Sequence, residues 1–148
     1  MRQKYYYLIE EYAKDIINNE NVLSQKEYMQ HGKTSVYEHT MNVALCSLSI
    51  AKKLNLNIDY KSLVRGSLLH DFFLYDWHVD DKSHRLHGFS HARVALNNAS
   101  KEFTLNNIEK NIIYTHMFPL NLRIPKYKES AIVCLADKIC ALKETFSR

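Results

Sequence analysis

The sequence predicts an all-α fold, a single compact bundle of six or seven helices that spans residues 1–148. The chain holds three glycines and two prolines in 148 residues, too few for the many turns of an all-β protein. Hydrophobic residues make up 46% and charged residues 24% of it, the usual balance of a soluble globular domain with one core. Several segments carry apolar residues at helical spacing, and no repeat or linker divides them.

Apolar periodicity and capping residues predict the helices of the first half. We expect an amphipathic helix over about 2–19. A short second helix begins at the capping-box pattern SQKE (Ser24 to Glu27) and ends at Gly32. A second capping box, SVYE (Ser35 to Glu38), begins a long helix that runs to about Leu54.

In the middle of the chain, Asp59 is the expected N-cap of a helix over about 60–75. Residues 76–90 are polar and without a period, which predicts a long loop of the kind that is functional or disordered. Ser90 is then expected to cap a helix over about 91–101.

Two helices complete the expected bundle. Thr104 or Asn106 is the expected cap of a helix that ends near His116, before a proline. A final helix is expected over about 127–146.

The charge and cysteine content narrow the function classes. The net charge is +4 and the pI is near 8.9, which suits an anionic substrate. No dense Lys/Arg run is present, so we expect no nucleic-acid partner. Cys46, Cys134 and Cys140 form no CxxC pair, as expected of a reduced cytoplasmic protein with buried thiols. The chain lacks an apolar run of about 18 residues, so no membrane span is expected.

Ionisable residues on otherwise apolar helix faces are the most informative positions. His39 shares a face with Val43, Cys46 and Ile50. Four further ionisable residues stand in apolar surroundings: His70, Asp71, His116 and Asp137. Any one of them alone could be a satisfied core histidine or a salt-bridged aspartate. Five such coincidences on four helices instead favour convergence of these side chains on metal ions.

Burial explains why a metal is the expected solution. A buried aspartate is costly unless it is paired or bound to a cation. Imidazole and carboxylate together form a nitrogen and oxygen ligand set that suits Fe, Mn, Zn, Co or Ni better than Ca, which prefers oxygen. We therefore expect a divalent transition metal as cofactor.

The order and spacing of these residues resemble a known family. His39, then His70-Asp71, then Asp137 resemble the H…HD…D signature of the HD-domain metal-dependent phosphohydrolase superfamily. The segments SVYEHTMNVA, GSLLHDFF and ADKICALKE look like its motif segments. The resemblance covers about residues 31–145 and implies an HD-type helical bundle.

Members of that superfamily that bind two metals carry two further histidines between the HD doublet and the last aspartate. His91 and His116 stand at the expected separation, although Ala92 and Ala95 replace the usual proline and glycine of the first motif. His87 begins HGFSH, which is similar to HGxxGA of the dinucleoside-tetraphosphate hydrolase branch. His91 is the preferred ligand and His87 the alternative.

The resemblance implies a two-metal site and a hydrolytic activity. One ion would be held by His39, His70, Asp71 and Asp137. The second would be held by His91 and His116, with Asp71 bridging; a version with one metal stays open. The implied reaction is attack of a metal-activated water on a phosphate ester or anhydride, of a nucleotide or dinucleotide in the first instance. Asp71, His87 and His31 are the expected catalytic residues.

Departures from the family pattern argue against one class of substrate, the cyclic dinucleotides. Leu74 stands where the cyclic-dinucleotide phosphodiesterases carry a lysine, and HMFPL replaces their GYP motif, so the resemblance does not extend to their reaction. Three other readings stay open: a helical metal-binding regulatory module without hydrolase activity, a di-iron oxygenase on the same scaffold and a nucleic-acid-binding helical domain. The expected partner is a small phosphorylated substrate. Whether the protein forms a homodimer is left open.

Overall fold

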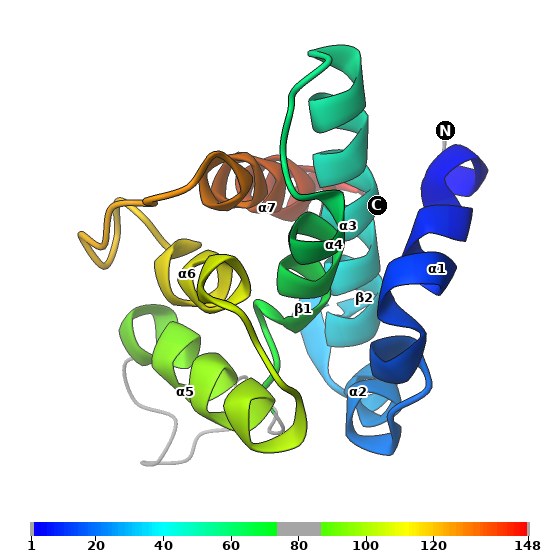
Figure 1. Ribbon diagram of the computed structural model, residues 1–148. Coiled ribbons are helices and arrows are strands. Elements are labelled where there is room, and N and C mark those ends of the chain that lie inside the picture. Colours follow the sequence, from blue (N-terminus) through cyan, green and yellow to red (C-terminus); the bar gives the residue numbers. More distant parts are fainter. Residues whose placement is uncertain (1, 74–86, 148) are drawn as a thin grey trace.

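The computed structural model describes residues 2–73 and 87–147 of the chain (Figure 1). Within these residues the regular structure is almost wholly helical, so the all-α prediction is confirmed. The elements in chain order are η1 (Arg2–Tyr5), α1 (Tyr6–Ile17), α2 (Glu20–Ser24), η2 (Gln25–Glu27), β1 (Met29–His31), β2 (Thr34–Ser35), α3 (Val36–Lys53), α4 (Tyr60–Leu69), α5 (His87–Glu102), α6 (Asn107–Thr115) and α7 (Lys128–Phe146).

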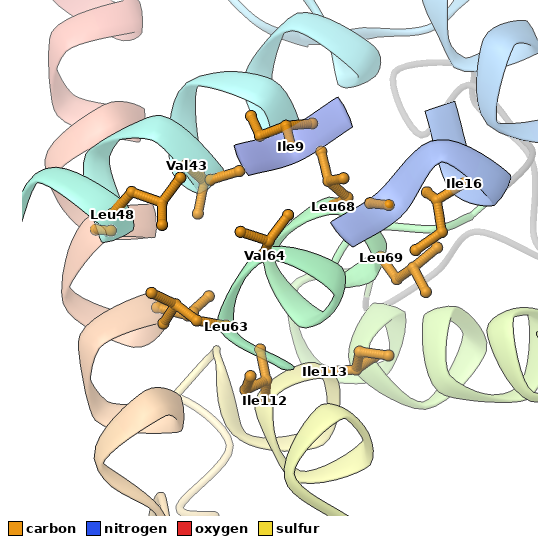
Figure 2. Close-up of a cluster of buried hydrophobic side chains, with 14 of the residues drawn as sticks. Ile9, Ile16, Val43, Leu48, Leu63, Val64, Leu68, Leu69, Ile112 and Ile113 are labelled. Carbon is orange, nitrogen blue, oxygen red and sulfur yellow. The ribbon is translucent and has the colours of Figure 1, made fainter. Parts of the chain in front are cut away.

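Helix α4 lies at the centre of the bundle and packs against α1, α3, α6 and α7 (Figure 1). Its buried side chains Leu63, Val64, Leu68 and Leu69 lie among buried side chains of α1, α3 and α6 in Figure 2. Burial of each such side chain contributes about 1.5–3 kcal/mol. The end of this central helix is therefore a rigid place on which to build a site.

The predicted caps begin three of the helices. Ser35 begins α3 with a capping box: its hydroxyl accepts the backbone N–H of Glu38 at 3.2 Å, and the Glu38 carboxylate accepts the Ser35 N–H at 3.0 Å. Asn106 begins α6 with a second capping box, so it and not Thr104 is the cap. Asp59 caps α4, as predicted.

The predicted helix from Ser24 to Gly32 is wrong. Ser24 ends α2, whose N-cap is Asn19, and the chain then passes through η2 into the antiparallel hairpin of β1 and β2. Gly32 turns this hairpin with a φ of +56°, which glycine adopts at no steric cost. A Cβ at Gly32 would also lie 2.9 Å from the backbone oxygen of Glu144. The glycine therefore lets the hairpin approach α7 closely.

Helix α4 ends at Leu69 and does not continue to residue 75 as predicted. The ring of His70 donates from Nδ1 to the backbone carbonyl of Ser67 at 2.6 Å. The next backbone bond runs from Phe72 to Leu69, the tighter three-residue turn. The HD doublet therefore lies in a turn after α4 and not on a helix.

Helix α5 begins at His87, before the predicted start at His91, so Ser90 lies inside the helix and is not its cap. Residues 76–86 of the predicted loop lie outside the described residues. Helix α7 agrees with the predicted final helix to within a residue.

The cysteines and the helix lengths bear on two further expectations. Cys134 and Cys140 are buried, Cys46 is half-buried, and all three are free thiols. Among residues 2–73 and 87–147, the helices fall short of the length and apolar character that crossing a membrane requires.

The close approach of α4 to α6 predicts a stability effect at Gly66. A Cβ at this position would lie 2.5 Å from Cδ1 of Ile112. In an open helix Gly→Ala gains up to about 1 kcal/mol, but here overpacking should reverse the sign. We expect Gly66→Ala to lower the free energy of unfolding by about 1–3 kcal/mol, measured by urea denaturation.

Two companion variants make this test specific. Adding Ile112→Val to Gly66→Ala removes the nearest clashing carbon and should restore part of the loss. Ser100→Ala, at an exposed position of α5, should change stability by no more than about 0.5 kcal/mol. A Gly66→Ala protein as stable as the wild type would contradict the packing described for α4 and α6.

Candidate metal centre

The six predicted ligand residues come together at one buried place. His39 is on α3, His91 on α5 and Asp137 on α7. The other three residues follow helix ends: His70 and Asp71 after α4, and His116 after α6. All six residues are buried.

Asp71 lies between two pairs of histidines. Its Oδ1 is 3.1 Å from Nε2 of His91 and 3.2 Å from Nε2 of His116. Its Oδ2 is 3.3 Å from Nε2 of His70 and 3.6 Å from Nε2 of His39. Each oxygen of one carboxylate therefore faces a separate pair of imidazole nitrogens.

Asp137 completes the first of these two groups. Its Oδ1 is 2.9 Å from Nε2 of His39 and 3.5 Å from Nε2 of His70. Ligand atoms within 4.8 Å of one another form two groups that share Asp71: His39, His70, Asp71 and Asp137, and Asp71, His91 and His116. Each group has the residue types and proximity to hold a metal ion.

Hydrogen bonds behind the rings determine which nitrogen faces inward. Nδ1 of His70 donates to the Ser67 carbonyl at 2.6 Å, and Nδ1 of His116 donates to the Ile113 carbonyl at 2.8 Å. A carbonyl oxygen only accepts, so Nδ1 carries the proton of the neutral ring. Nε2 of both rings then directs its lone pair toward Asp71.

The profile of the HD domain family matches residues 36–142, more than half of the chain and a range that contains all six of these residues. The chain belongs to the HD domain family. HD domains are in general metal-dependent phosphohydrolases. No curated protein and no solved structure matches the chain.

The chemistry of the buried donor atoms in this HD domain fits a metal. Nε2 of His70 and Oδ1 of Asp71 are buried without a hydrogen-bond partner, and Nε2 of His91 lies 2.9 Å from Nε2 of His116. Buried electron-pair donors that face one another are costly unless a cation lies among them. Imidazole and carboxylate donors in this number suit a divalent transition metal.

The pKa values of three of these groups shift in the direction that a neighbouring opposite charge produces. Burial alone would lower the pKa of His39, but its hydrogen bonds to Asp137 and Glu144 outweigh burial and raise the pKa to about 9. Burial would also lower the pKa of His70, but the charge of Asp71 outweighs burial and raises this pKa well above its ordinary value. Burial would raise the pKa of Asp71, yet the neighbouring histidines hold that pKa well below its usual range.

Glu144, on α7, is a member of the site that sequence reasoning missed. Its Oε2 accepts a hydrogen bond from Nδ1 of His39 at 2.7 Å, and its Oε1 accepts one from the Asn42 amide at 2.9 Å. Glu144 follows Asp137 by seven residues, two helical turns along the same face. That spacing was a signal that could have found it.

Two glutamines that sequence reasoning also missed hold Asp71 in place. The amide of Gln30, on β1, donates to Oδ2 of Asp71 at 2.6 Å. The amide of Gln25, on η2, donates to the backbone carbonyl of Asp71 at 2.9 Å. Both come from the segment predicted as a helix, so the hairpin that replaced it supports the site directly.

The two remaining predicted residues differ in what the structure describes. His31, on β1, is half-buried, and its ring centroid lies 5.2 Å from that of His39. Burial and the charge of His39 lower the pKa of His31. His87 begins α5, but its side chain lies outside the described part of the chain, so its role remains a prediction.

The hydrogen bond behind His39 predicts a specific effect on metal binding. Glu144→Gln keeps the size of the side chain but removes the charge that orients and polarises His39. Loss of such an outer partner typically lowers metal affinity by about 10- to 100-fold, and we expect this loss in a competition assay against a chelating dye.

Glu129→Gln is the matched control for this variant. Glu129 is also buried on α7, but its Oε1 accepts the backbone N–H of Asp59 at 2.8 Å, away from the centre. We expect this variant to affect stability while metal affinity stays at the wild-type value. Equal affinity in Glu144→Gln and wild type would refute the role given to Glu144.

Proposed function

We propose that this HD domain hydrolyses a phosphate ester or anhydride with two divalent metal ions that share Asp71. The observation that carries the proposal is the carboxylate of Asp71, whose Oδ1 faces His91 and His116 while its Oδ2 faces His39 and His70. A carboxylate can bridge two ions through its two oxygens. Paired ions about 3.5–4 Å apart are the usual arrangement of two-metal phosphoryl chemistry.

The ligands divide into two sets. In this proposal, one ion is held by His39, His70, Asp71 and Asp137, and the other by Asp71, His91 and His116. Fe, Mn, Zn, Co or Ni suits these donors. When bound, such ions would supply Lewis-acid chemistry: they would lower the pKa of a bound water to about 7 and stabilise charge on phosphoryl oxygens.

The side chains of the chain then have separate tasks. Gln30 holds Oδ2 of Asp71 and so keeps the bridging carboxylate in one orientation. Glu144 does the same for the ring of His39. His31 lines the cavity beside the centre, and in this proposal it donates a hydrogen bond to a phosphate oxygen; His87 stays a second candidate for this contact.

Charge balance supports an anionic substrate. Asp71, Asp137 and Glu144 bring three negative charges to the centre, whereas two divalent ions would bring four positive ones. The excess positive charge favours a phosphate group, as does the mildly basic chain as a whole. Nucleotides and dinucleotides, including dinucleoside tetraphosphates, are the substrates we propose to test first.

Substitution of the two aspartates tests the proposed function. Asp71→Ala and Asp137→Ala should each abolish hydrolysis of a nucleotide-phosphate panel and lower metal content, because each removes a charged donor. The measurements are phosphate release with added Mn, Co, Ni or Fe, and elemental analysis of the purified protein.

Asp15→Ala is the control. Asp15 pairs with Arg65 at 2.6 Å on the other side of α4, and its loss should leave activity and metal content unchanged. Wild-type turnover in either of the other two variants would refute the site. Stoichiometric metal without turnover on any phosphate compound would instead favour the regulatory module, and oxygen consumption by the iron-loaded protein would favour the oxygenase.

A further inference from the structure

A cavity of about 530 Å³ opens beside the metal centre. Asp71, His91 and Asp137 line one part of it, so a phosphate bound at the centre would extend into this space. The volume lies within the range of about 300–1,000 Å³ that is usual for small-molecule sites. The cavity is therefore large enough for the organic part of a substrate.

The part of the cavity away from the centre is apolar. It is lined by Met117, Pro119 and Leu120, from the turn after α6, and by Ala141 of α7. Leu120 exposes 47% of its surface, so a ligand in the cavity would cover apolar area that now faces water. Covering such area is favourable by about 25 cal/mol per Å².

Lys138 also lines the cavity, but its N–H groups are directed to acceptors within the protein. It is the one lysine or arginine among the described residues that line the cavity. Its ammonium group donates to the backbone carbonyls of His116 and Cys134, at 3.1 and 3.4 Å, and to Sγ of Cys134 at 3.1 Å. These three contacts use its three N–H groups, so the side chain offers its methylene groups to a ligand.

We propose that this cavity binds the organic group of a phosphomonoester, and that this group has an apolar aromatic or aliphatic surface. The proposal rests on the proposed function and narrows its substrate. A chain of further phosphates would require several cations along the wall, whereas Lys138 is the one lysine or arginine of the described lining and its N–H groups already have acceptors within the protein. In the reaction a water oxygen bonds to phosphorus and the P–O bond to the organic group breaks. The leaving oxygen takes up a proton, so the products are an alcohol and inorganic phosphate.

Two pairs of matched compounds test the proposal. Phenethyl phosphate and ethylene glycol monophosphate both release a primary alcohol but differ in apolar surface. Phenethylphosphonate and methylphosphonate form the second pair; neither can be hydrolysed, and they differ in the apolar surface of the organic group. With the manganese-loaded protein, we expect kcat/KM for phenethyl phosphate to be at least about tenfold higher than kcat/KM for ethylene glycol monophosphate. We expect it to exceed kcat/KM for diadenosine tetraphosphate by the same factor.

Calorimetry with the phosphonates provides a readout apart from turnover. Phenethylphosphonate should bind at least about tenfold more tightly than methylphosphonate, in manganese-loaded protein and in protein treated with a chelator, because the wall does not depend on metal. Its binding should also show the more negative heat-capacity change of apolar burial.

Leu120→Asn and Leu122→Asn form the matched pair of variants. Leu120 lines the cavity, whereas Leu122 lies two residues later, outside the lining, and is 80% exposed. Leu122 has a φ of +56°, which asparagine tolerates. Leu120→Asn should remove most of the preference for the phenethyl compounds, mainly through KM, while Leu122→Asn keeps it.

The outcomes separate this proposal from the proposed function. Hydrolysis without preference for the apolar ester, or an unchanged preference in Leu120→Asn, would overturn the cavity proposal and leave the hydrolase intact. Tighter binding of phenethylphosphonate without hydrolysis of any ester would support the cavity and overturn the hydrolase.

Discussion

Asp71 is buried with each of its carboxylate oxygens facing a separate pair of imidazole nitrogens. A carboxylate in that position is costly unless positive charge lies beside it. Protonated histidines can supply the charge, as the raised pKa values of His39 and His70 show. Divalent ions would supply it more completely, since they would also accept the lone pairs of His91 and His116. Every other feature of the site places ligands around this one carboxylate.

The scaffold holds Asp71 from three directions. Helix α4, at the centre of the core, ends immediately before the HD doublet, so the turn that carries Asp71 starts from a well-buried helix. Gln25 binds the backbone of this turn and Gln30 binds the carboxylate itself. Gly32 allows the hairpin that carries Gln30 to lie against α7 near Glu144. The short hairpin, which departs from the all-α pattern, thus places Gln30 against Asp71.

The core-facing residues of the site could be predicted from the sequence, but two of their supporting partners, Gln25 and Gln30, could not. An ionisable group on an apolar helix face can be recognised in the sequence, as for His39 and Asp137, because its neighbours at helical spacing are apolar. Gln30 carries no such signal, because it lies on a three-residue strand of a short hairpin and meets Asp71 only through a contact between residues 41 positions apart. The turn at Asp71 could not be predicted either, because the apolar run continues past the end of α4. Apolar periodicity also gives no information on the hydrogen bond from the His70 side chain to the Ser67 carbonyl that accompanies the end of the helix. Glu144 was predictable from its seven-residue spacing and was missed.

The central claim is that two metal ions share Asp71. Anomalous diffraction from crystals of the manganese-loaded protein tests it most directly, because it locates each ion without relying on activity. Two ions that share Asp71 should give two peaks about 3.5–4 Å apart, one beside His39, His70 and Asp137 and the other beside His91 and His116, with a different oxygen of Asp71 bound to each. A single peak at these residues, or manganese bound only elsewhere on the protein, would contradict it.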